Sequence, residues 1–155
     1  MSMKEINKLV KGLDPKADAF AGTVYTDIWS MRNYGAAEVI RYDGVGTTGT
    51  SLITVEACDD VSASTTSAVP FKYQEIASGD IPGAITNATT AGFTTTAGSS
   101  KIIRIYVDAS VLASSGYEFC RAKFVEVADA AVLGGVIVEL KQPRSDAEVP
   151  VTAIV

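Results

Sequence analysis

Residues 101–108 read Lys-Ile-Ile-Arg-Ile-Tyr-Val-Asp, so that Ile103, Ile105 and Val107 alternate with a set that contains Arg104 and Asp108. Successive side chains of a β-strand point to opposite faces, and this period of two therefore predicts a strand with one buried face. Three other stretches repeat the pattern. The predicted core residues are Ile53, Val55, Ala57, Ile103, Ile105, Val107, Cys120, Ala122, Phe124, Val136, Val138 and Leu140.

Short runs rich in Val, Ile, Thr and Tyr fill the chain after Gly22, and loops of Gly, Ser, Thr, Asn and Asp separate them. This composition is typical of an all-β protein. The predicted strands cover residues 23–29, 36–42, 51–57, 69–75, 101–108, 117–127 and 134–141.

Charged side chains occupy the faces opposite the predicted core, with Arg121 and Lys123 in one strand and Glu139 and Lys141 in another. Each sheet is therefore expected to have one solvated side, as antiparallel sheets commonly do. Two such sheets stacked on their apolar faces form an antiparallel β-sandwich, which we expect to be jelly-roll-like. Alternation alone does not distinguish jelly-roll from immunoglobulin-like connections.

The first dozen residues are spaced like one face of a helix, and Gly12 with Asp14-Pro15 would end it. The apolar residues at this spacing are Met3, Ile6, Leu9, Val10 and Leu13. At the other end, residues 148–155 are largely apolar, and Pro150 favours an edge strand or an extended arm, in this domain or on a neighbouring chain. The expected organisation is an N-terminal helix and arm (1–22), a sandwich (23–141) and an extended C-terminal tail (142–155).

The composition excludes several partners. A net charge of -5 and a pI near 4.7, with no Lys/Arg cluster, argue against nucleic-acid binding. No stretch approaches the ~20 apolar residues of a membrane span, and no secretory signal is recognisable. We expect a protein that remains soluble where it is made and whose partners are other proteins.

The chain contains no histidine, so the commonest general base and metal ligand is missing. Cys58 and Cys120 are widely spaced and are expected to be buried free thiols. Asp59-Asp60 predicts a turn rather than a calcium site. The glycines of residues 44–49 precede a strand, so they predict a hairpin and not a phosphate loop. We therefore expect no catalytic, cofactor-binding or metal-binding residues, and no enzyme.

Aromatic residues leave two alternatives open. Phe93 lies in the long loop 87–100 and either packs onto the sandwich or anchors a partner. Aromatics on the early strands could stack on a sugar, although core or interface roles are commoner. These aromatics are Tyr25, Trp29, Tyr34 and Tyr42.

Four stretches have a familiar order: Asn-Tyr-Gly-Ala-Ala-Glu-Val-Ile-Arg at 33–41, a Thr/Val strand ending in Asp-Asp at 49–60, Ala-Val-Pro-Phe at 68–71, and Tyr-Glu-Phe-Cys-Arg within 116–123. In this order the chain resembles the small decoration, or cement, proteins of tailed-bacteriophage capsids. The resemblance spans residues 23–140, and its motifs are structural.

The resemblance implies a β-sandwich present in many copies on the capsid exterior, made in the host cytoplasm and bound to the major capsid protein and to copies of itself. It implies no catalytic residue. A neck, tail or head-fibre component is the nearest alternative within a virion. A carbohydrate-binding or adhesin module on the same sandwich is the alternative from another class.

Overall fold

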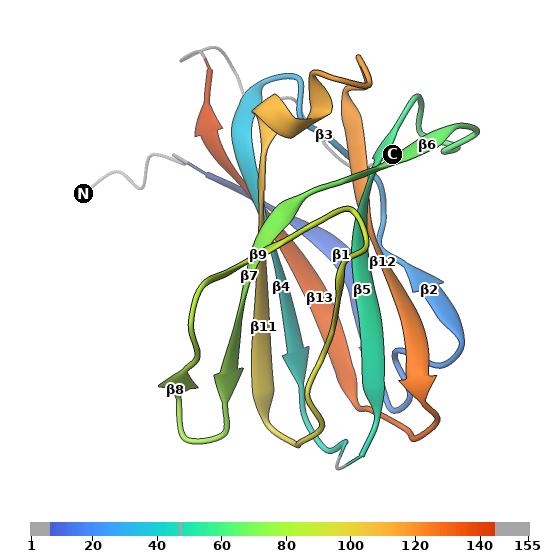
Figure 1. The fold of residues 1–155 in the computed structure, drawn as a ribbon, viewed down its shortest axis with the longest axis vertical. Coiled ribbons are helices and arrows are strands. Elements are labelled where there is room, and N and C mark those ends of the chain that lie inside the picture. The colour runs from blue at the N-terminus through green and yellow to red at the C-terminus, as the bar shows by residue number, and fades with distance from the viewer. Residues whose placement is uncertain (1–6, 47, 145–155) are drawn as a thin grey trace.

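The chain folds into two antiparallel sheets, shown in Figure 1. The computed structural model describes residues 7–46 and 48–144. The larger sheet contains, from edge to edge, β1 (Lys8–Lys16), β13 (Gly134–Pro143), β4 (Tyr34–Asp43), β11 (Lys101–Asp108), β7 (Phe71–Ala77) and β8 (Ile81–Pro82), and β9 (Thr86–Ala88) also pairs with β7.

The smaller sheet is built on two long strands that lie side by side. Its order is β10 (Phe93–Thr94), β5 (Thr50–Cys58), β12 (Phe119–Ala128) and β2 (Thr23–Tyr25); β3 (Trp29–Ser30) also pairs with β12, and β6 (Thr66–Val69) also pairs with β5. One short 3-10 helix, η1 (Ala109–Leu112), follows β11, and the side chain of Asp108 caps it by accepting a hydrogen bond from the amide of Ser110.

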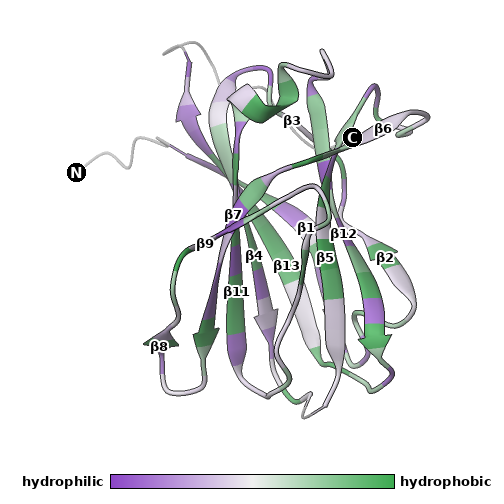
Figure 2. Cartoon of the chain, in the orientation of Figure 1, coloured by the Kyte–Doolittle hydropathy of each residue, from purple (hydrophilic) through white to green (hydrophobic). Residues whose placement is uncertain are grey.

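The core lies between the two sheets. All twelve residues that alternation placed in the core are buried, and none is more than 3% exposed. They belong to one cluster with Trp29, Tyr34 and Phe71, and that cluster contains side chains of both sheets. The two sheets are therefore packed on their apolar faces, and Figure 2 shows the underlying alternation along strands such as β11.

Most of the predicted strands are confirmed, with two interruptions. Residues 23–29 contribute to two short strands, β2 and β3, which both pair with β12. Between them the amide of Asp27 donates instead to the carbonyl of Gly12 on β1. Residues 69–75 are divided at Pro70, between β6 of the smaller sheet and β7 of the larger one. Proline has no N–H for a sheet ladder, which suits a point where the chain changes sheets.

The predicted N-terminal helix is wrong over the residues that the structure describes. Residues 8–16 form β1 and pair with β13, Leu9 opposite Glu139 and Lys11 opposite Ile137. The apolar Leu9 is 67% exposed in the regular part of this strand, and the register shifts between Lys11 and Leu13, so the apolar residues of β1 do not follow a period of two. Met3 and Ile6 lie outside the described residues.

The predicted hairpin at residues 44–49 is also wrong. This segment leads from β4 in the larger sheet to β5 in the smaller one. It packs against the loop before β13, where the amide of Gly44 donates to the carbonyl of Leu133 at 2.7 Å. A Cβ atom on Gly49 would lie 2.5 Å from the carbonyl oxygen of Ala130, so close backbone approach explains this glycine.

A buried arginine lies between the sheets. Arg41, on β4, forms two hydrogen bonds with the carboxylate of Asp43, at 2.7 and 2.9 Å, and donates to the hydroxyl of Ser51 on β5 at 3.0 Å. Its guanidinium carbon lies 3.5 Å from the ring centre of Phe20. Because the side chain is 1% exposed, these contacts replace the water that a charge would otherwise need.

We predict that Arg41→Ala destabilises the fold by about 3–5 kcal/mol, because it leaves the carboxylate of Asp43 buried without its cation. The measurement is the free energy of unfolding in urea. Arg41→Met combined with Asp43→Leu should recover part of this loss, since it removes both charges. Lys11→Met, at an exposed pair, is the control and should change stability by no more than about 0.5 kcal/mol. Equal losses for Arg41→Ala and Lys11→Met would contradict the prediction.

The loop around Phe93 packs onto its own sandwich, so the alternative of an anchor for a partner is wrong. The ring of Phe93 stacks on that of Tyr73 with centroids 3.6 Å apart and is buried at 9% exposure. Gly92 precedes it with φ +76°, and a Cβ there would meet the carbonyl oxygen of Ile53 at 2.0 Å. A residue without a side chain is therefore needed to bring Phe93 onto the edge of β5.

Gly92→Ala should destabilise the protein clearly more than Gly116→Ala. Both glycines have positive φ, and Gly116, at φ +70°, has open space around its missing Cβ. Gly116→Ala therefore carries only the left-handed backbone cost of about 1–2 kcal/mol, whereas Gly92→Ala adds a clash with the backbone. Thermal and urea unfolding of the two variants test this, and similar losses would show that the contact with Ile53 is unimportant.

Candidate functional site

The acidic pair at residues 59–60 shapes a turn, as predicted. The carboxylate of Asp59 accepts from the amides of Asp60 and Thr65, both at 2.9 Å, and that of Asp60 accepts from the amide of Ser62 at 2.8 Å. The hydrogen bond from Thr65 is the main reason why the pKa of Asp59 is lowered. Among the described residues, no group of three or more His, Cys, Asp or Glu side chains could hold a metal ion.

Both cysteines are free and buried, as predicted. Burial raises the pKa of the Cys58 thiol to about 11 and raises the pKa of Cys120 well above its usual value. Since the thiolate is the reactive form, neither side chain is arranged as a nucleophile. Their place in the sandwich indicates a packing role, as small apolar side chains on β5 and β12.

The early aromatic residues do not form one platform. Trp29 and Tyr34 lie in the core at 0% and 2% exposure, which confirms the commoner of the two roles considered for them. Tyr25 and Tyr42 are exposed, but they belong to different sheets. On the smaller sheet, the guanidinium of Arg121 lies 4.0 Å from the ring centre of Tyr25 and forms an ion pair with Glu56 at 2.8 Å.

A cluster of paired charges lies on the outer face of the larger sheet. The carboxylate of Glu38 accepts from Arg104 and Lys141, and Lys141 also lies 3.1 Å from Glu139. Although Glu38 points away from the core, its side chain is only 5% exposed because the two cations cover it. Burial alone would raise the pKa of Glu38, but the hydrogen bonds from Arg104 and Lys141 outweigh it and lower the pKa.

The lowered pKa of Glu38 makes stability depend on pH. The ionised carboxyl stabilises the fold above its unfolded-state pKa, about 4.3, and this contribution is lost as the pH falls through the lower folded-state pKa. The melting temperature of the native sequence should therefore exceed that of Glu38→Gln near neutral pH, and the gap should narrow in acid. Glu118→Gln removes an exposed carboxyl and is the control, which should change the melting temperature little near neutral pH. A Glu38→Gln gap that widens in acid would contradict this assignment.

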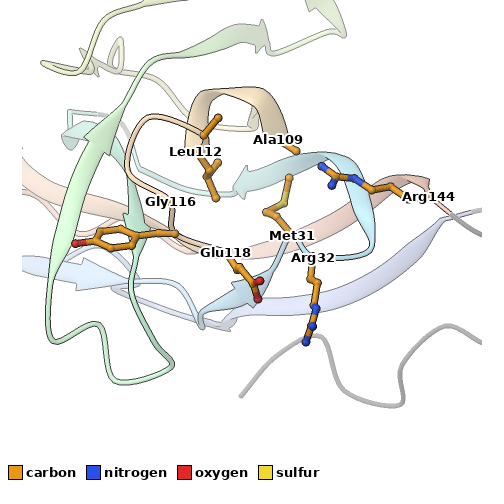
Figure 3. A pocket seen from close by; sticks show the side chains of 9 residues that line it. Met31, Arg32, Ala109, Leu112, Gly116, Glu118 and Arg144 are labelled. Carbon is orange, nitrogen blue, oxygen red and sulfur yellow. The ribbon is translucent and has the colours of Figure 1, made fainter.

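A pocket of about 360 Å³ opens at the end of the sandwich that carries η1 (Figure 3). Met31 and Leu112 give it an apolar floor. Arg32, Glu118 and Arg144 place two positive charges and one negative charge around it. The backbone holds this end together, since the amide of Arg144 donates to the carbonyl of Asn33. The pocket combines apolar and charged lining residues, and the sequence interpretation had not identified it.

Exposed apolar side chains gather on the larger sheet, contrary to the expectation that both outer faces are polar. Tyr42 and Ile137 are 61% and 52% exposed on β4 and β13, and Leu9 is exposed on the edge strand β1. The sequence interpretation missed this because it assigned outward positions from the charged residues alone. The signal was present in the outward members of each alternating stretch, such as Ile102 and Ile137.

Comparisons with known proteins assign no family. No family model matches the chain, and no curated protein matches it. The crystal structure of the SPBc2 prophage-derived protein YomS is similar in fold at a TM-score of 0.49 and 10% sequence identity, over 86% of this chain and 91% of that one. No helix among residues 7–46 and 48–144 has the length and apolar character needed to cross a membrane.

Proposed function

We propose that this chain is a structural protein of a tailed-bacteriophage virion and, within that class, a decoration protein that binds the capsid exterior and bridges neighbouring major capsid subunits. In this proposal it has no catalytic role, binds no nucleic acid or membrane, is made in the host cytoplasm and acts in the assembled particle together with copies of itself.

The strand order is the observation that carries the proposal. One sheet contains β1, β13, β4 and β11 in that order, and the other contains β2, β12, β5 and β10. Paired in this way, early and late strands of the chain lie side by side in both sheets, which is the arrangement of a jelly roll. The strands β7, β8 and β9 extend the first sheet beyond β11. Jelly rolls are common in viral capsids, and this supports the resemblance in the sequence.

The charge distribution also supports a place outside the capsid. The chain carries a net charge of -5, which disfavours contact with packaged DNA. Ion pairs such as Arg41 with Asp43 and Lys101 with Glu75 are built into the fold instead of facing a ligand. Weak contacts repeated by symmetry would be enough to hold such a subunit on a shell.

The alternatives differ in what supports them. The hypothesis of a carbohydrate-binding module depended on an aromatic platform. Two residues of that platform, Trp29 and Tyr34, are buried in the core. A neck, tail or head-fibre component would use the same fold, and copy number separates it from a decoration protein. Decoration implies on the order of hundreds of copies in each particle, and a neck or tail ring implies about six or twelve.

Electron microscopy of purified virions, with quantitative mass spectrometry for copy number, tests the proposal. The expected result is density for this sandwich on the outside of the head. A binding assay adds a second readout: purified protein should co-sediment with capsids that lack it and should not co-sediment with free DNA. Absence of the chain from the head exterior would overturn the decoration role, whichever copy number is found elsewhere in the particle.

A further inference from the structure

The outer face of the larger sheet carries a continuous apolar band across five strands, β13, β4, β11, β7 and β8. Strand register places Ile137 opposite Ile40, Tyr42 opposite Ile102, and Ile102 opposite Ile76. Ile76 is in turn opposite Pro82 on β8. Figure 2 shows the end of β7 that contains Ile76 coloured as hydrophobic. We call Ile40, Tyr42, Ile76, Pro82, Ile102 and Ile137 the apolar band.

The charges beside the apolar band are already neutralised within the molecule. Glu38 and Glu139 are matched by Arg104 and Lys141, and Lys11 is paired with Asp14. The side chain of Glu38 is nearly buried in the isolated chain, so covering the cluster would remove little further water from it. The charges of these pairs therefore cancel beside the band, on a molecule whose overall charge is -5.

We propose that the apolar band is an interface between two copies of this chain. Two acidic molecules repel each other over most of their surfaces, and a neutral apolar face is where that repulsion is weakest. A two-fold axis would place the band of one copy on the band of the other, as in a sheet-on-sheet packing. The same symmetry covers the charged cluster together with the band, and the charges of that cluster are already paired within each copy.

The size of the face fits a stable dimer. Five strands, β1, β13, β4, β11 and β7, at a spacing of about 4.8 Å and with about eight residues at ~3.3 Å each, cover about 24 by 26 Å. That is roughly 600 Å² in projection, and side chains rising from the sheet bring the accessible area toward the ~800 Å² per partner of a standard interface. The inference deepens the proposed structural role, because it names the surface through which copies associate.

Sedimentation velocity and light scattering of the purified chain test the interface. The native protein should have twice the monomer mass of 16.2 kDa at concentrations of tens of micromolar. Ile137→Asp and Tyr42→Asp each place a charge within the apolar band, and each should weaken dimerisation by at least about tenfold. Unchanged far-ultraviolet circular dichroism and cooperative melting would show that the variants are folded.

Val127→Asp is the matched control, because Val127 is 59% exposed on β12 of the smaller sheet and Ile137 is 52% exposed on β13. It should leave the dimer intact. A native protein that stays monomeric would overturn the inference and assign the band to another partner, such as the capsid. A dimer that survives both Ile137→Asp and Tyr42→Asp would overturn it as well. Neither result depends on capsids, so failure here is distinguishable from failure of the decoration role.

Discussion

A guanidinium group enclosed between two sheets is the constraint on which this end of the sandwich depends. Burying the charge of Arg41 would be prohibitive without its two hydrogen bonds to Asp43, the hydroxyl of Ser51 and the ring of Phe20. These partners come from both sheets and from the segment after β1. Because all of these partners must contact Arg41 at the same time, they hold the crossing from β4 to β5 in place. Thr95 reinforces this crossing by accepting a hydrogen bond from the amide of Ser51.

Other charged side chains of the molecule are also paired with a group of opposite charge. Lys101 is buried against Glu75, and Glu38 is covered by Arg104 and Lys141 on the outer face. Charged groups that are already paired in this way stabilise one arrangement of strands and leave the surrounding surface nearly neutral. A nearly neutral surface next to the apolar band favours contact between two copies of the chain. The pairing of charges within the fold therefore supports the proposed role of a subunit that associates with its own copies.

Local patterns predicted much of the fold. Alternation placed every proposed core residue correctly, because the period of two depends only on the direction of neighbouring side chains along a strand. It failed at residues 8–13, where the apolar Leu9 is exposed and the pairing with β13 shifts after Lys11, and at residues 44–49, where a glycine loop changes sheets. Of the surface features, the turn at Asp59 was predicted, whereas the end pocket and the apolar band were not.

By itself, the sequence determined the all-β class, the buried faces and the turn at residues 59–60, since each follows from residues close together in the chain. Only the tertiary structure decided the order of strands, the burial of Arg41 and the alignment of Ile137 with Ile40 and of Tyr42 with Ile102. These features join residues far apart in sequence. Their energies depend on which strands become neighbours, and the local alternation of residues does not specify which strands pair.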